Sequence, residues 1–338
     1  AKLNLGRAFN KPLVPGDLPA NLTTLEFGWY FNQRLIVGTL PASLTSLVLP
    51  VHGHFNQPLV KGALPVNLRL AELGNFSRPL IEGMLPASLR KVRFGERFNH
   101  PLVRNVFPVA LEVLVFCAAF NQPLVPGVLP DSLERLEFGS DFNQRLVVGA
   151  LPSSLEYLVF GERFNEGLEP GVLPDRLERL EFGSDFNQRL VVGALPSSLD
   201  YLVFGERFNE VLAPGVLPAN LAKVHFGREF NQTLAPGAFP TDLLEVCFGD
   251  NFRKPLAAGV LPVNLEQVNF ARYDANRPAY FAPGVEPPSG TEVKYRSATA
   301  WNPYGLCDCS PSPGWQHDSD DDVESEDEET MLYGCGGY

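Results

Sequence analysis

The chain has 338 residues, of which 45% are hydrophobic and 20% charged, so general disorder is excluded. Of the 39 acidic residues, ten lie at 301–338, where Lys and Arg are absent, so residues 1–300 carry 29 acidic against 27 basic residues. A nearly neutral body with an acidic tail argues against nucleic acid as the main partner, because phosphate binding needs clustered Lys and Arg. The sequence has no run of 18 apolar residues, so we expect no membrane-spanning segment.

A phenylalanine that is usually followed by asparagine recurs along most of the chain. The intervals between copies are 22, 24 and 21 residues and then 22 residues throughout. A fixed period near 22 residues predicts a solenoid of stacked coils, each of which buries its apolar face against its neighbours. The copies are Phe9, Phe31, Phe55, Phe76, Phe98, Phe120, Phe142, Phe164, Phe186, Phe208, Phe230 and Phe252.

Each repeat contains a strand segment, a turn and a return segment. In residues 155–160 (LEYLVF), positions 1, 4 and 6 are apolar, and positions 4 and 6 point to the same face of a strand, towards the core. We interpret Gly161 as a turn residue that needs a positive φ, and Phe164 as a second core residue. Asn165 is expected to stack on the equivalent asparagines of neighbouring repeats and to hydrogen-bond loop backbone groups. Glycine and proline farther on mark the bend towards the next strand.

The pattern resembles the leucine-rich repeat and, more closely, the FNIP-repeat family, which is named for Phe-Asn-Ile-Pro. The matching residues are 55–59 (FNQPL), followed by Leu-Pro and by Leu-x-x-Leu-x-Phe-Gly, and the likeness covers about residues 3–270. We expect a β-rich, leucine-rich-repeat-like right-handed solenoid of about twelve 22-residue coils. It has one parallel β-sheet, short or irregular return segments and modest curvature. The 24-residue interval, with Pro50 in place of the turn glycine, predicts an altered loop near residues 50–54.

The chain is expected to divide into three regions. Residues 1–270 form the solenoid, residues 271–300 a degenerate thirteenth repeat that caps it, and residues 301–338 an acidic, disordered tail. Residues 286–295 align with 261–270 but carry Glu286 and Gly290 in place of two core leucines. At the start, Leu3 belongs to the back half of a strand whose front half is absent. We therefore expect an open N-terminal edge, which either self-associates or follows another domain.

The five cysteines are an odd number and their spacing is not that of a disulfide framework. This favours a reducing compartment, and we expect a cytoplasmic protein. Three Asn-x-Ser/Thr sequences, at Asn21, Asn75 and Asn231, leave a secreted origin open, and a virion-associated protein is also left open.

The sheet face is where the repeats differ, so binding is expected there. Positions 3 and 5 of each strand point away from the core, and neighbouring strands lie about 4.8 Å apart. Arg179 should therefore lie between Tyr157 and Tyr201, and Tyr and Arg are the residues that interface hot spots favour. The candidate partner-binding residues are Lys91, Arg93, Arg135, Glu137, Tyr157, Val159, Arg179, Glu181, Tyr201, Val203, Lys223 and His225.

The alternative for these residues is an internal ladder that satisfies itself through cation–π contacts and cross-strand ion pairs. Residues 127–170 and 171–214 differ at only four positions, so duplication alone would double such a ladder without selection for a ligand.

Residues His225, Cys247 and Asn269 fall on consecutive strands in one row and are the residue types of a cysteine-protease site. In such a site the base lies between the nucleophile and the orienting group, whereas here Cys247 lies in the middle. We therefore expect no catalytic residues.

The tail contains Cys307, Cys309, His317 and Cys335, which could ligate zinc, but their spacing matches no familiar zinc finger. We expect free thiols there, and no metal or cofactor anywhere in the chain.

The sequence predicts a non-enzymatic protein–protein interaction scaffold that presents a rigid sheet face to a protein partner. Some members of the resembled family join such repeats to an F-box, which implies a substrate reader of a ubiquitin-ligase adaptor. The alternative is a structural or self-assembling protein, such as a shell, filament or virion component, joined through the open solenoid edge.

Overall fold

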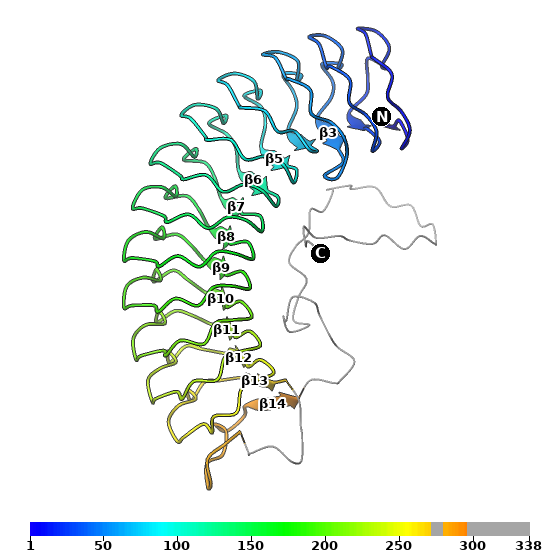
Figure 1. Ribbon diagram of the computed structural model, residues 1–338. Helices are drawn as coiled ribbons and strands as arrows, with labels where there is room; N and C mark the ends of the chain where they lie inside the picture. Colours follow the sequence, from blue (N-terminus) through cyan, green and yellow to red (C-terminus); the bar gives the residue numbers. More distant parts are fainter. Residues whose placement is uncertain (272–279, 296–338) are drawn as a thin grey trace.

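The computed structural model describes residues 1–271 and 280–295 and shows a single parallel sheet whose strands follow one another in chain order. These residues contain fourteen strands and no helix, and the segments between strands are turns and irregular loops (Figure 1). The strands are β1 (Lys2–Asn4), β2 (Thr24–Glu26), β3 (Ser46–Leu49), β4 (Leu70–Leu73), β5 (Lys91–Phe94), β6 (Val113–Phe116), β7 (Arg135–Glu137), β8 (Tyr157–Val159), β9 (Arg179–Glu181), β10 (Tyr201–Val203), β11 (Lys223–His225), β12 (Glu245–Cys247), β13 (Gln267–Phe270) and β14 (Glu292–Tyr295).

The register of the sheet follows directly from the repeat. Leu158 of β8 pairs with Leu136 of β7 on one side and with Leu180 of β9 on the other, so residues 22 apart are direct neighbours. Equivalent positions therefore form straight rows across the sheet, and the expected leucine-rich-repeat-like solenoid is confirmed.

The core lies between the sheet and the return segments and consists of leucine rows and two columns of phenylalanine. Leu155 and Leu158 are fully buried, as the strand pattern predicts. Phe160 at the end of the strand segment stacks on Phe164 of the following loop, with ring centroids 3.8 Å apart. The same pair recurs in most coils, so each phenylalanine contacts aromatic rings within its own coil and in the coils on either side.

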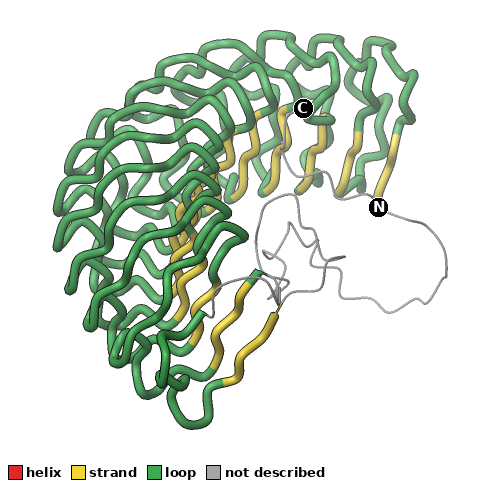
Figure 2. The backbone as a smooth tube through the Cα atoms, turned by 60° about the horizontal axis from the view of Figure 1, so that its bottom comes forward, coloured by secondary structure: helices red, strands yellow, loops and turns green. Residues whose placement is uncertain are grey.

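The solenoid is bent into a pronounced arc with the strands on its concave side (Figures 1 and 2). The expectation of modest curvature is therefore wrong. Neighbouring backbones in a sheet lie about 4.8 Å apart. The ring centroids of Phe160 and Phe182 are already 5.7 Å apart, and those of Phe164 and Phe186 are 6.1 Å apart. A stack whose spacing widens away from the sheet bends towards the sheet, even without helices on the outside.

Glycine follows the strand phenylalanine for a reason other than the expected one. Gly161 does not have a positive φ, so that interpretation is wrong. A Cβ atom at Gly161 would lie only 1.8 Å from the carbonyl oxygen of Gly139 in the preceding coil. Glycine is required there because two backbones approach closely. The positive φ occurs instead at the bend of the return segment, for example 81° at Gly149.

The asparagines after the second phenylalanine form the expected ladder. The backbone N–H of Asn187 donates to Oδ1 of Asn165, and that of Asn165 donates to Oδ1 of Asn143, both at 2.9 Å. Nε2 of Gln188 also donates to Oδ1 of Asn165, at 3.0 Å. These bonds satisfy loop N–H groups that no strand pairing reaches.

The altered loop near residues 50–54 is confirmed. Pro50 directly follows β3, and its carbonyl accepts a hydrogen bond from the N–H of Gly53 at 2.8 Å, which closes a tight turn that holds the extra residues. The side chain of Asn75 from the next coil donates to the carbonyl of Gly53 at 2.6 Å and fixes this turn.

The last strand, β14, pairs with β13 in the register that the sequence alignment gives, with Val293 opposite Val268 and Tyr295 opposite Phe270. At the other end, β1 is the edge strand of the sheet. The division of the chain at residues 270 and 300 stays a prediction, and the acidic tail at 301–338 lies outside the described residues.

Candidate functional site on the concave face

The twelve candidate partner-binding residues all lie on the concave face, on β5 and on β7 to β11. Nine of them are partly exposed, whereas Glu181, Val203 and His225 are buried. Lys91 and Arg93 of β5 are separated from the others by β6, which presents Val113 and Val115. The structure therefore brings together ten of the twelve, on β7 to β11.

Arginine and tyrosine alternate at position 3 of the six-residue strand segments that contain β7 to β10. We call Arg135, Tyr157, Arg179 and Tyr201 the Tyr–Arg ladder. Cζ of Arg135 lies 3.8 Å from the ring centroid of Tyr157. Cζ of Arg179 lies 4.1 Å from the ring centroid of Tyr201 and 5.2 Å from that of Tyr157. Arg179 is thus placed between the two tyrosines, as the sequence predicts. These are cation–π contacts, which hold the guanidinium groups in place.

Glutamates at position 5 complete the ladder. Nε of Arg179 lies 2.8 Å from Oε1 of Glu181, and Arg135 makes the equivalent ion pair with Glu137. The hydroxyl of Tyr157 donates to the same Oε1 of Glu181, across the β8–β9 pair. The internal ladder contacts that the sequence suggested as an alternative are therefore present. They fix the side chains of the ladder in one arrangement.

The ladder shifts two pKa values. Burial and then the negative charge and hydrogen bond of Glu181 raise the pKa of Tyr157 well above its ordinary 10.0. Burial acts to lower the pKa of Arg179, but Glu181 and the neighbouring tyrosines outweigh it, so that the pKa is raised. The tyrosine hydroxyl is therefore neutral and the guanidinium charged over the physiological range of pH.

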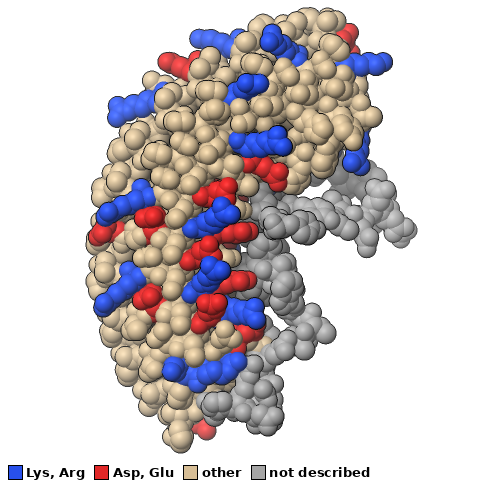
Figure 3. Space-filling model, viewed as in Figure 1, with Lys and Arg blue, Asp and Glu red and all other residues tan. Residues whose placement is uncertain are grey.

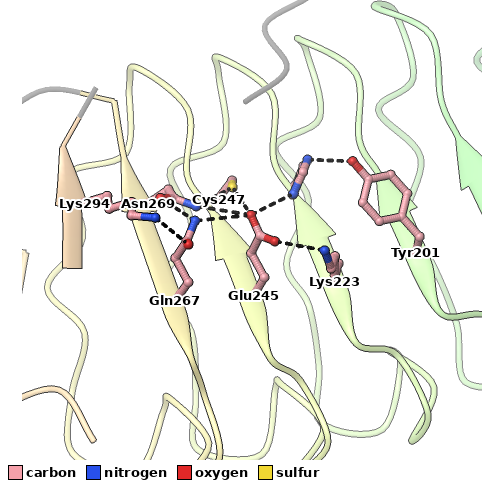
Figure 4. A network of polar contacts seen from close by, with 8 residues as sticks. Tyr201, Lys223, Glu245, Cys247, Gln267, Asn269 and Lys294 are labelled. Atoms are coloured by element: carbon pink, nitrogen blue, oxygen red, sulfur yellow. Dashed lines mark hydrogen bonds and ion pairs between the residues drawn. The ribbon is translucent and has the colours of Figure 1, made fainter. Parts of the chain in front are cut away.

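A second polar feature lies on the next two strands, β11 and β12, and we call His225, Glu245 and Cys247 the buried polar cluster (Figure 4). One potential ligand atom from each residue lies within 4.8 Å of the others. Glu245 and Cys247 are two residues apart on β12 and share its concave face, and His225 lies directly opposite Cys247 on β11. All three are buried: the exposed fraction is 3% for His225, 8% for Glu245 and 0% for Cys247.

Polar side chains surround this cluster. The hydroxyl of Tyr201 lies 3.0 Å from Nδ1 of His225. Nζ of Lys223 lies 3.4 Å from Oε2 of Glu245. Nδ2 of Asn269 lies 3.0 Å from Sγ of Cys247 and 3.3 Å from Oε1 of Glu245. Tyr201 therefore belongs to the ladder and also contacts the cluster.

The sequence placed His225, Cys247 and Asn269 in one row, and the structure agrees, with Cys247 in the middle. Glu245 was missed as a member of this group because it stands at position 3, in the other row. Its position two residues before Cys247 was the available signal, because residues i and i+2 of a strand share one face.

Charged side chains on the view of Figure 3 alternate in sign along the arc rather than forming a broad area of one sign. Several are paired between neighbouring coils, such as Arg163 with Asp141 at 2.8 Å and Arg207 with Asp185 at 2.9 Å. The part of the chain that the structure describes contains no helix that could span a lipid bilayer.

The fold and the concave surface define a leucine-rich-repeat-like solenoid, a class typical of protein-interaction scaffolds and usually non-enzymatic. The model of the FNIP repeat matches residues 9–50, 55–97, 98–141, 142–185, 186–229 and 230–273, so the chain belongs to the FNIP-repeat family. A comparison with curated protein sequences finds no match.

The solved structures that are similar to the chain include a circular LRR protein and an internalin. The crystal structure of CroV588, described as a novel circular LRR protein structure, has 33% sequence identity and a TM-score of 0.67. The match covers 86% of this chain, which spans only about half (49%) of that protein. An internalin (inlF) from Listeria monocytogenes str. 4b F2365 has 16% identity and a TM-score of 0.55 over 81% of this chain and 80% of its own. This second likeness concerns the fold alone.

Proposed function

We propose that the chain is a non-enzymatic scaffold that binds a protein partner on the concave face, with the Tyr–Arg ladder at the centre of the interface. The observation that carries the proposal is the fixed stack of Tyr157, Arg179 and Tyr201, which Glu181 anchors. Tyrosine and arginine are the residues most enriched at interface hot spots. Because cation–π contacts and ion pairs already hold these side chains, little side-chain entropy is lost on binding.

The exposed parts of the ladder and the neighbouring Lys223 form a surface that is partly charged and partly apolar. The side chain of Arg179 is 23% exposed and that of Lys223 is 43% exposed, so charged groups reach the solvent beside the partly exposed tyrosine rings. A partner segment that offers carboxylates and apolar side chains in alternation would match this surface. In the finer form of the proposal, implied by the family resemblance, the partner is a substrate presented to a ubiquitin ligase.

The experiment is affinity capture from a lysate of the source cells, with three baits compared side by side. The first is the wild-type chain, and the second carries Arg135→Ala, Tyr157→Ala, Arg179→Ala and Tyr201→Ala. The third is a matched control with Arg145→Ala and Arg189→Ala, two exposed arginines in the return segments. Circular dichroism checks that all three fold. The proposal predicts a protein that the first and third baits capture and the second does not.

A partner captured equally by all three baits would show that the ladder is only internal. Recovery of ubiquitin-ligase subunits together with the partner would support the finer form, and their absence would remove it while leaving the scaffold in place.

A second candidate function is self-assembly through the ends of the sheet. The arc of Figure 1, and the match of this chain to about half of a protein described as circular, favour it. In this case the edge strands β1 and β14 of different copies pair. Light scattering over a range of concentrations tests the candidate: a mass that rises with concentration supports it, and a constant monomer mass contradicts it.

A further inference from the structure

We propose that the buried polar cluster is a binding site for a divalent transition-metal ion, zinc in the first instance, with His225, Glu245 and Cys247 as its protein ligands. Imidazole nitrogen, carboxylate oxygen and thiolate sulfur are the ligand types that Zn²⁺ accepts, whereas Mg²⁺ and Ca²⁺ prefer oxygen alone.

Two of the three distances between ligand atoms match those of a tetrahedral zinc site. Zinc bonds of about 2.0–2.3 Å place neighbouring ligand atoms about 3.4–3.6 Å apart. In the structure, Nε2 of His225 lies 3.6 Å from Oε1 of Glu245, and Sγ of Cys247 lies 3.5 Å from the same oxygen. The third pair is within 4.8 Å. Three protein ligands leave a fourth position for water or a substrate group, as in catalytic zinc sites.

The imidazole of His225 supplies independent evidence for a ligand. Its Nε2 atom is fully buried, lies 3.6 Å from Oε1 of Glu245 and has no hydrogen-bond partner among the described residues. Burial of a polar atom without a partner is costly. Its other nitrogen, Nδ1, is 3.0 Å from the Tyr201 hydroxyl. If Nδ1 carries the proton and donates it to that oxygen, the lone pair of Nε2 faces Glu245 and Cys247, as a metal-ligating histidine requires.

The groups around the other two ligands also fit an ion. Lys223 contacts Oε2 of Glu245, which leaves Oε1 turned towards His225 and Cys247. The contacts to Oε1 include those from Cys247, Asn269 and Nε2 of Gln267, at 3.5, 3.3 and 3.5 Å, and all three are longer than strong hydrogen bonds. Nδ2 of Asn269 approaches Sγ of Cys247 to 3.0 Å, a close contact that suits a negatively charged thiolate. A thiolate and a carboxylate together would balance the charge of a divalent ion.

The experiment uses the full chain, with Cys307, Cys309 and Cys335 changed to serine so that the tail thiols take no part. After treatment with a chelator, the protein is titrated with Zn²⁺ in a calorimeter and with Co²⁺ in a spectrophotometer. The proposal predicts one equivalent of each ion, and a thiolate-to-cobalt charge-transfer band. Zinc should also raise the midpoint of thermal unfolding, because the ion binds the folded chain.

Three variants in the same background separate a metal site from a purely hydrogen-bonded network. His225→Asn and Cys247→Ser should each abolish the equivalent of zinc and the thermal shift. Tyr201→Phe keeps all three ligands and should weaken binding by about 10–100-fold. Cys117→Ser, which changes a buried cysteine on a distant coil, is the control and should bind like its parent.

The proposal is overturned if the tail-substituted chain takes up no zinc, or if His225→Asn and Cys247→Ser bind it as well as the parent does. Circular dichroism decides whether a variant that binds no zinc is folded. If one of the two is unfolded, the weakened binding of Tyr201→Phe relative to Cys117→Ser becomes the deciding result, and equal affinities of these two contradict the site.

Discussion

Tyr201 and His225 connect the two polar features of the concave face, with the tyrosine hydroxyl 3.0 Å from Nδ1 of the histidine. The same tyrosine ring lies under the guanidinium of Arg179, 4.1 Å from its Cζ. One side chain therefore contacts both the Tyr–Arg ladder and the buried polar cluster. Strands β9 to β11 hold these groups in direct register, so a change at Tyr201 reaches both features.

The phenylalanine columns should carry a large share of the stability. Phe186 is fully buried and stacks on Phe182 at 3.7 Å. We expect Phe186→Ala to lower the free energy of unfolding by about 3–5 kcal/mol, through lost contacts and a cavity. Urea denaturation followed by circular dichroism measures this loss. The exposed Val192→Ala is the control and should change stability by less than about 0.5 kcal/mol. A loss below about 1 kcal/mol for Phe186→Ala would contradict the role given to the column.

The glycine after the strand phenylalanine should tolerate no side chain. A Cβ at Gly161 would lie 1.8 Å from the oxygen of Gly139, and this oxygen is held in a turn in which it accepts a hydrogen bond from the N–H of Phe142 at 3.2 Å. We expect Gly161→Ala to lower the free energy of unfolding by at least about 2 kcal/mol. Gly167→Ala is a matched control in the same coil, because a Cβ there meets nothing within 4 Å. Equal midpoints of urea unfolding for the two variants would show that the coils can move apart at no cost.

The raised pKa of Tyr157 makes the ladder sensitive to alkaline pH. Its pKa is higher in the folded chain than the 10.0 of a free tyrosine, so the folded state holds the proton more tightly. The stability that this difference represents is complete below about pH 10, and it is lost as the pH rises from there towards the higher folded value. We expect the free energy of unfolding of the wild type to fall more steeply above pH 10 than that of Tyr157→Phe. Parallel curves for the two proteins, measured by urea denaturation at each pH, would contradict the shift.

The strands and their register could be predicted from the sequence because one period governs the chain. With 22 residues between equivalent positions, Leu158 has to pair with the leucines at 136 and 180, and the two phenylalanines of each coil have to form columns. Any other register would expose these apolar side chains.

The curvature and the role of Gly161 could not be predicted in the same way. Both a positive φ and a close backbone approach select glycine, so its presence alone does not say which applies. The bend depends on the difference between strand spacing and ring spacing, which is a property of packing between coils rather than of one repeat.

Only part of the buried polar cluster could be predicted from the sequence, for a similar reason. His225, Cys247 and Asn269 stand in one row, and the sequence shows them together. Glu245 stands in the neighbouring row, and its side chain reaches across to the others only once its rotamer is fixed by Lys223 and Asn269. A pattern of rows gives positions on the sheet but not the directions of long side chains.

The most direct test of the proposed function is the dissociation constant of the captured partner for single ladder variants. We expect Arg179→Ala to raise the dissociation constant at least about tenfold, equivalent to about 1.4 kcal/mol, because the arginine lies at the centre of the ladder. Arg189→Ala, an exposed arginine in the return segment of the same coil, should leave it unchanged. Equal dissociation constants for the wild type and Arg179→Ala would contradict a concave interface centred on the Tyr–Arg ladder.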